Sequence, residues 1–220
     1  MPCFCHSRNS AVAQKITSPD EFIACIEIPK GGKNKYEMDK ETGLLYLDRV
    51  LYTSTHYPAN YGFIPRTYAD DNDPLDVLVL CQAEIIPLCL VECRPIGVIK
   101  MIDNDMVDEK IIAVPCNDPS WNSYHNIDEM PEHIFDEMRH FFRVYKELEG
   151  KTTSIVETRG PKEAERLSTF DLLGALRHVK SQNPTFARKK PRSTYAEMLR
   201  NIRMRIEFKV LRKTNISITV

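Results

Sequence analysis

The chain has 220 residues, with 42% apolar and 28% charged residues, which is enough for one globular domain with a sizeable core. It has no apolar run near the ~20 residues of a membrane-spanning helix. It has seven cysteines without a Cys-x-x-Cys spacing, which argues against a disulfide framework or a zinc site and favours a reducing compartment. The net charge of −1 hides an asymmetry, because residues 168–220 hold 12 Lys/Arg against 3 Asp/Glu and the rest is acidic.

The N-terminus gives only a weak targeting signal. Its first nineteen residues lack acids and include Arg8 and Lys15, but they show no obvious amphipathic pattern. We therefore expect residues 1–20 to be disordered and the protein to be cytoplasmic, with an organelle as the alternative.

The body of the chain reads first as a series of short strands separated by clusters of Gly, Pro, Asn and Asp. This spacing favours a small barrel or sandwich over βαβ winding. The segments between residues 31 and 43 read as turn, short strand and turn. The longer runs rich in apolar residues are Glu21–Pro29, Leu44–Tyr52, Asp76–Cys81, Cys89–Asp103 and Lys110–Pro115.

Two helices are expected after the strands. Met130–Gly150 has a proline near its start, a glycine at its end and apolar residues recurring every three or four positions. Gly160–Val179 begins as a second helix, with Gly174 as a weak point. Asn183–Ser193 is the best linker candidate, and the basic segment beyond it lacks a clean apolar face.

One turn is crowded with carboxylates at the start of an apolar strand. The stretch "YADDNDPLDVLVLCQ" places Asp71, Asp73 and Asp76 around Pro74, so the three carboxylates can converge on one point. A calcium loop of the EF-hand type would need glycine at its sixth position, where Asp76 stands. A solvated acidic turn and a metal site both remain open from this motif alone.

A second acidic pair and a set of cations favour the metal site. Asp103 and Asp108 lie at another strand-to-strand connection, just before Lys110. Oxygen ligands from several loops suit Mg²⁺ or Mn²⁺. Carboxylates accompanied by Lys, Arg and Tyr are typical of a phosphate substrate bridged by metals. The accompanying residues are Lys35, Arg49, Lys110, Lys146, Tyr57, Tyr61 and Tyr145.

From about Phe22 to Leu167 the chain resembles the soluble family I inorganic pyrophosphatases, of the short type found in bacteria and plants. The segments that are similar occur in family order: "IEIPKG", "KYE", "DRVLYTSTHYPANYGFIPRT", "DNDPLD", "CRPIG", "KIIAVP" and "HFFRVYKELE". The resemblance implies an α+β fold, with a small five-stranded OB-like antiparallel β-barrel flanked by helices. It also implies Mg²⁺-dependent hydrolysis of pyrophosphate by direct attack of an activated water.

The resemblance assigns a role to each candidate residue. It implies that Asp73 is the general base, that Tyr61 lies near the nucleophile, and that Glu27 and Tyr57 support the cavity. The implied metal ligands are Asp71, Asp76, Asp103, Asp108 and Glu37. The implied phosphate-binding residues are Lys35, Arg49, Tyr61, Lys110, Tyr145 and Lys146.

The chain departs from the family pattern at two places. Leu88 follows Pro87 where the family usually has glycine, so a positive φ there would cost about 1 kcal/mol or more. The basic segment 180–220 extends beyond the usual end, and we expect it to be a poorly ordered extension of a domain spanning 21–179. The alternative to an enzyme is a barrel that binds metal or nucleic acid. Because the body is acidic, a nucleic-acid partner is not expected, and neither is a membrane partner. An arm that binds nucleic acid or an anionic membrane is the alternative for the basic tail, and a homo-oligomer remains open.

Overall fold

The computed structural model describes residues 20–39, 42–65, 67, 69, 73–103 and 106–167. All of them belong to the first of the two units into which the chain divides, Met1–Leu176. The predicted N-terminal disorder, the basic extension and the second half of the predicted closing helix lie outside the described residues. So does Asp71 of the acidic turn.

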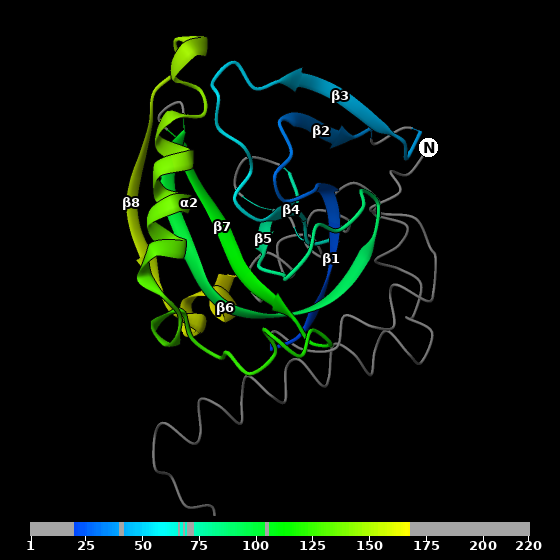
Figure 1. Cartoon of the computed structure of the whole chain (residues 1–220), viewed down its shortest axis with the longest axis vertical. Coiled ribbons are helices and arrows are strands. Elements are labelled where there is room, and N and C mark those ends of the chain that lie inside the picture. Colours follow the sequence, from blue (N-terminus) through cyan, green and yellow to red (C-terminus); the bar gives the residue numbers. More distant parts are fainter. Residues whose placement is uncertain are drawn as a thin grey trace, which may run out of the picture. The chain divides into compact units, whose positions relative to one another are not determined.

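A mixed six-stranded sheet forms the body of the molecule (Figure 1), in the order β1-β4-β5-β7-β6-β8. Its strands are β1 (Phe22–Ile28), β4 (Asn60–Phe63), β5 (Asp76–Val79), β6 (Leu90–Asp103), β7 (Met106–Pro115) and β8 (Thr153–Arg159). A further pairing of β1 with β6 links five of these strands in a ring, as in an OB-like fold. β2 (Asn34–Met38) and β3 (Leu45–Val50) form a separate two-stranded sheet.

The α+β, OB-like prediction is confirmed, with one correction to its strand directions. β5 and β7 pair in parallel, so the sheet is mixed and not wholly antiparallel. Two strands were missed by the sequence analysis. β4 has only four residues and includes a glycine, and β8 is a polar edge strand that pairs only with β6 among the described elements.

The long apolar runs of β5, β6 and β7 arise because both faces of these strands are buried. Leu78 and Ile112 belong to one hydrophobic cluster, whereas Val77 and Ile111 belong to another. Successive residues of a strand point to opposite faces, so a strand buried on both sides needs apolar residues at consecutive positions. The region 161–167, which is helical, contributes Ala164 and Leu167 to the second cluster.

Helix α2 (Glu132–Val144) covers the other face of the sheet. Its buried residues, Phe135, Met138, Phe141 and Phe142, belong to the first cluster, and in Figure 1 the helix runs alongside β8. The helix is shorter than the predicted range Met130–Gly150. It begins after Pro131 and ends at Val144, and the short 3₁₀ helices η2 (Ile127–Glu129) and η3 (Glu147–Glu149) flank it.

Leu88 has a positive φ. Its position, where the family usually has glycine, had raised that question. Its φ is 65°, the one positive value among the described residues other than glycine. A side chain in the left-handed region is strained because Cβ crowds the backbone. The backbone N–H of Leu88 nevertheless donates to the carbonyl of Ile26 at 2.7 Å, so the turn is tied to β1.

We expect Leu88→Gly to stabilise the protein by about 0.5–1 kcal/mol. Relief of the strain exceeds the entropy that glycine adds to the unfolded chain. The measurement is the midpoint of denaturant unfolding, compared with Ile86→Gly, which removes a neighbouring exposed apolar side chain without relieving strain. A Leu88→Gly variant that unfolds earlier than the parent protein would contradict this expectation.

Candidate active site

The predicted site residues come from most elements of the fold. Glu27 lies on β1, Lys35 and Glu37 on β2, Arg49 on β3 and Tyr61 on β4. The later strands and the end of α2 contribute the others: Asp76 on β5, Asp103 on β6, Asp108 and Lys110 on β7, and Tyr145 and Lys146 just after α2. Asp73 is exposed in the turn before β5, and Tyr57 is buried in the loop before β4.

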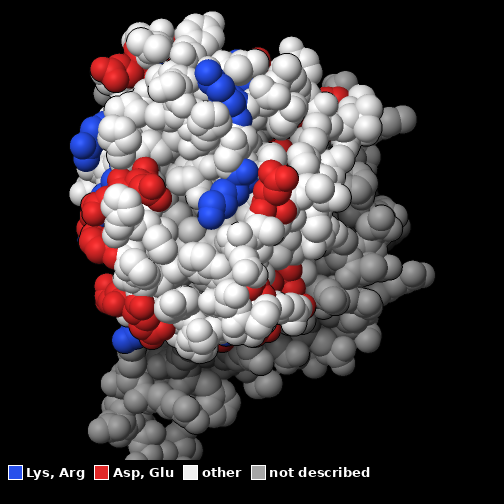
Figure 2. Space-filling view, in the orientation of Figure 1, with Lys and Arg blue, Asp and Glu red and all other residues white. Residues whose placement is uncertain are grey.

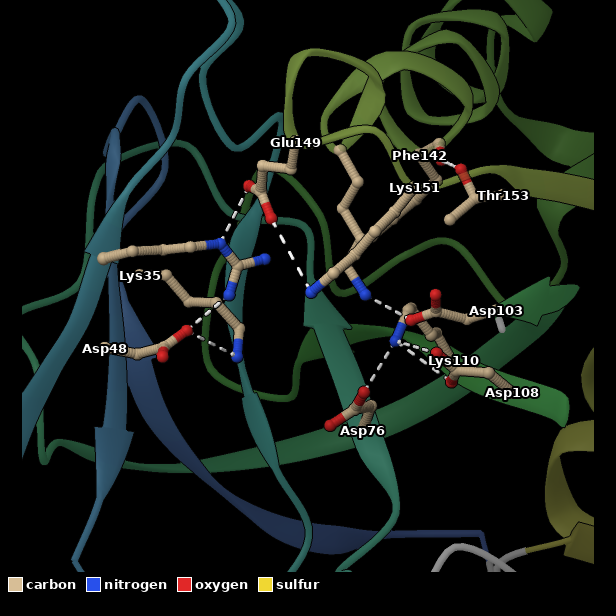
Figure 3. Close-up of polar contacts among 12 residues, drawn as sticks. Lys35, Asp48, Asp76, Asp103, Asp108, Lys110, Phe142, Glu149, Lys151 and Thr153 are labelled. Atoms are coloured by element: carbon tan, nitrogen blue, oxygen red, sulfur yellow. Dashed lines mark hydrogen bonds and ion pairs between the residues drawn. The ribbon is translucent and has the colours of Figure 1, made fainter. Parts of the chain in front are cut away.

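Lys110 is the centre of one charged cluster. In the parallel pairing of β5 with β7, Asp76 and Lys110 are direct partners, and Asp108 lies two residues earlier on the same face of β7. The ammonium group of Lys110 lies 2.6 Å from Asp76 Oδ2 and 3.0 Å from Asp108 Oδ1 (Figure 3). Tyr61 donates its hydroxyl to Asp76, so four polar side chains meet at one point.

Burial and charge act in opposite directions on this cluster. Burial lowers the pKa of Lys110, but the negative charges of Asp76 and Asp108 outweigh it, so the pKa is raised and the side chain stays an ammonium ion. Burial, together with the negative charges of Asp76 and Asp103, raises the pKa of Asp108 against the opposing effect of Lys110. Burial also raises the pKa of Tyr61, which keeps its hydroxyl a hydrogen-bond donor. The cluster is therefore a concentration of charge in which the Lys110 ammonium group is buried and the two carboxylates are partly exposed.

A second pair extends the cluster along the end of β6. Lys146 donates to Asp103 Oδ2, and the other oxygen of Asp103 is buried without a hydrogen-bond partner among the described residues. The Lys146 ammonium also lies 5.2 Å from the ring centroid of Tyr145. Burial raises the pKa of Tyr145. A row of aromatic rings connects Lys146 with the Lys110 cluster. Tyr145 packs on Phe141, Phe141 on Tyr57, and Tyr57 on Tyr61, whose ring lies 5.4 Å from the Lys110 ammonium group.

A third cluster lies on the β2–β3 hairpin. Lys35 and Arg49 are partners in the antiparallel register, and Asp48 contacts both of them, with Lys35 Nζ 3.3 Å from Asp48 Oδ2. Lys35 also pairs with Glu37, and Arg49 donates to Glu149 of η3. On the face shown in Figure 2, basic and acidic side chains are interspersed and not separated into patches.

Hydrogen bonds tie the last turn of α2 to β8, and backbone hydrogen bonds close the turn that follows the helix. Thr153 Oγ1 donates to the carbonyls of Phe142 and Arg143, the latter at 3.3 Å, and Gly150 adopts φ 71° at the end of η3. A positive φ is easy for glycine and reverses the chain within few residues. This arrangement places Glu149 on the same side as the clusters described above (Figure 3), and Lys146 against Asp103.

The sequence analysis did not predict Asp48 and Glu149, which belong to these clusters, or Thr153, which holds the last turn of α2. Asp48 precedes Arg49 directly, so its proximity to that cation could have been read from the sequence. Glu149 and Thr153 carried no such signal. Glu149 is 100 residues from Arg49 in the chain, and only the fold brings the two together.

The side chains that surround these cations could hold a divalent cation by their chemistry. Asp76, Asp103 and Asp108 offer only oxygen donors, and the unpartnered Oδ1 of Asp103 is an acceptor that a cation would satisfy. Among the described residues no three His, Cys, Asp or Glu side chains are arranged closely enough to hold a metal ion. The lysine ammonium groups lie against these carboxylates instead, and Asp71 is outside the described part.

Glu27 is a buried carboxyl group beside these clusters. Its Oε1 accepts the backbone N–H of Met38 at 2.7 Å, and only 9% of the residue is exposed. Burial raises the pKa of Glu27 from 4.5 to about 7, against the opposing effect of the Met38 N–H. The pKa of Glu27 is higher in the folded protein than in the unfolded chain, so the unfolded chain loses this proton at a lower pH. The protein therefore loses stability as the pH rises from 4.5 to about 7.

We expect Glu27→Gln to remove most of this pH dependence. In metal-free protein the variant should gain up to about 3 kcal/mol over the parent at pH 8, at about 1.4 kcal/mol per pKa unit, and little at pH 5. Denaturant unfolding at both pH values measures this, with the exposed Glu137→Gln as the control. If the parent and Glu27→Gln change in stability by the same amount between pH 5 and pH 8, Glu27 does not titrate as described.

Comparison with known proteins identifies the family to which this architecture belongs. A family model described as inorganic pyrophosphatase matches residues 24–169. The chain belongs to the inorganic pyrophosphatase family. It is 46% identical over 147 residues to the soluble inorganic pyrophosphatase 2 of Chlamydomonas reinhardtii, covering 66% of this chain and 77% of that protein. It is also 46% identical over 160 residues to the soluble inorganic pyrophosphatase of Oryza sativa subsp. indica, covering 72% and 75%.

The fold agrees with that of solved inorganic pyrophosphatases. The crystal structure of the enzyme from Thermus thermophilus matches with a TM-score of 0.70 at 38% identity, covering 71% of this chain and 92% of that one. The resemblance stated from sequence motifs is therefore confirmed at the level of family and fold. Among the described residues, no helix has the length and apolar character needed to span a membrane.

Proposed function

We propose that this pyrophosphatase family member hydrolyses inorganic pyrophosphate to two phosphates in a Mg²⁺-dependent reaction, with water as the direct nucleophile. The observation that carries the proposal is the convergence of Asp76, Asp108 and Tyr61 around the buried ammonium group of Lys110, within the span that matches the family. Metal-binding carboxylates beside cations suit a substrate with several negative charges.

The acidic residues have two roles in this proposal. Asp71, Asp76, Asp103, Asp108 and Glu37 would hold the divalent cations. When bound, Mg²⁺ would lower the pKa of water and neutralise charge on the substrate. Asp73 takes the proton of the attacking water as general base, and Tyr61 orients that water through its hydroxyl.

The cations bind the substrate and stabilise the leaving group. Ammonium and guanidinium groups in a partly desolvated site hold phosphate oxygens more tightly than they would in water. Tyr57 and Glu27 line the cavity and keep the other groups in place. The phosphate-binding set is Lys35, Arg49, Tyr61, Lys110, Tyr145 and Lys146. No serine or cysteine nucleophile is needed, so we expect no phosphoenzyme.

Cellular setting and partners follow from the same proposal. The named relatives are soluble pyrophosphatases, which supports a soluble enzyme acting on a small molecule. We propose the cytoplasm as its compartment. We propose no nucleic-acid or membrane partner. A homo-oligomer is compatible with the proposal.

The test is phosphate release by the purified full-length chain with Mg²⁺, using pyrophosphate, tripolyphosphate and ATP in parallel. We expect fast release from pyrophosphate, poor release from ATP and none after chelation of the metal. Folded protein that releases no phosphate from pyrophosphate above background would refute the proposal and favour a non-enzymatic binding barrel. Equal rates on ATP and pyrophosphate would refute the assigned substrate.

A further inference from the structure

The guanidinium group of Arg49 is held at two of its three nitrogens. Its Nε donates to Glu149 Oε1 at 2.8 Å, and its Nη1 donates to Asp48 Oδ2. Its Nη2 is buried and has no hydrogen-bond partner among the described residues. Because the guanidinium is planar, two fixed nitrogens determine where the third one points.

Glu149 is the more constrained of the two carboxylates. Its side chain is 8% exposed, whereas that of Asp48 is 32% exposed and is shared with Lys35. Glu149 is held in turn by its backbone, because η3 ends at Gly150 and the N–H of Lys151 donates to the carbonyl of Lys146 at 3.3 Å. Glu149 therefore stands on the same short turn as Lys146, which pairs with Asp103.

We infer that Glu149 is a positioning residue, which orients the guanidinium of Arg49 so that Nη2 is presented to a phosphate oxygen of the substrate. This inference rests on the proposed function, in which Arg49 binds phosphate. An anion approaching the unpaired N–H group would satisfy a buried donor that is otherwise costly to leave unpaired. The Nε contact fixes the plane without occupying the nitrogen that binds.

The ion pairs with Glu149 and Asp48 also keep the Arg49 guanidinium charged. Burial lowers the pKa of Arg49, but Glu149 and Asp48 raise it further, so the guanidinium stays charged in its partly buried position. Without Glu149, Nε of Arg49 would lose its acceptor, and the guanidinium could rotate so that both Nη atoms face Asp48. The free nitrogen would then no longer have a fixed direction, and phosphate binding would weaken.

A purely structural role is the competing explanation, since the same ion pair ties η3 to the β2–β3 hairpin. The two explanations differ in what happens when Arg49 is already absent. A positioning residue that acts through Arg49 has little left to contribute in that background, whereas a residue that acts on its own keeps its full effect.

The experiment is a double-mutant cycle in the full-length chain. Glu149→Ala is measured alone and combined with Arg49→Ala, by steady-state hydrolysis of pyrophosphate and by the affinity for inorganic phosphate without turnover. We expect Glu149→Ala alone to lower kcat/KM and phosphate affinity about tenfold, and less than about twofold in the Arg49→Ala background. Glu149→Gln should lose less, because its amide oxygen still accepts from Nε.

A matched control is Glu163→Gln, since Glu163 pairs with Lys100 and Arg166, and none of the three is a proposed site residue. It should leave both measurements within about twofold. If Glu149→Ala does not fold, the cycle is read from Glu149→Gln. An unchanged kcat/KM and phosphate affinity in the Glu149 variants, or an equal loss with and without Arg49, would overturn the inference. If the parent chain does not hydrolyse pyrophosphate, the proposed function fails by itself, and the phosphate-affinity cycle still decides the role of Glu149.

Discussion

Asp73→Asn is expected to slow pyrophosphate hydrolysis by about 100- to 10,000-fold without unfolding the protein, because loss of a general base has effects of this size. An amide has nearly the same shape as the carboxyl group but cannot take a proton from water. Two hydrogen bonds that hold this turn do not involve that carboxylate. Ala69 N–H donates to the backbone carbonyl of Asp73 at 2.8 Å, and Thr67 Oγ1 accepts the N–H of Leu75 at 2.7 Å.

The measurement is kcat across pH 6–9, with unfolding midpoints as the test of folding. Asp136→Asn serves as the control, because it removes an exposed carboxylate that contacts Arg139 on the surface of α2. Asp76→Asn should differ from Asp73→Asn by weakening the response to Mg²⁺ concentration, since Asp76 is a proposed metal ligand. Hydrolysis at the parental rate by Asp73→Asn over this whole pH range would show that another group is the base.

Gly62→Ala is expected to destabilise the protein by about 4 kcal/mol or more, which is an exceptional effect for one methyl group. Gly62 lies on β4 between its register partners Ile26 of β1 and Val77 of β5. A Cβ atom there would lie 1.9 Å from the backbone oxygen of Cys25. Backbone cannot move aside as a flexible side chain can, so β1 and β4 would have to separate and break the ladder between them.

Unfolding midpoints and soluble yield measure this effect, and the change should also reduce hydrolysis, because Tyr61 is the preceding residue. Gly160→Ala is the matched control, because its Cβ would lie 3.3 Å from the side-chain oxygen of Asn126, which can adjust. We expect this control to stay within about 1 kcal/mol of the parent. A Gly62→Ala protein as stable as the parent would mean that β1 and β4 do not lie as close as described.

Much of the fold could be predicted from local patterns. β1, β5, β6 and β7 were found because strands buried on both faces are continuous apolar runs, and α2 because its apolar residues recur every three or four positions. β8 was missed because only two of its seven residues, Ile155 and Val156, are apolar, which gives no clear strand pattern. The end of α2 was placed too late, since helix ends depend on contacts such as those of Thr153 with the last turn.

The sequence by itself determined the family and raised the question of a positive φ at Leu88, because motifs and the positions of Gly and Pro are local properties. Which residues meet was decided by the tertiary structure. Asp76 and Lys110 are 34 residues apart and touch because β5 and β7 pair in parallel in one register. Arg49 and Glu149 are 100 residues apart and meet through the turn after α2. Strand register depends on pairing between segments that are distant in the chain, so the apolar runs of β5 and β7 do not fix it by themselves.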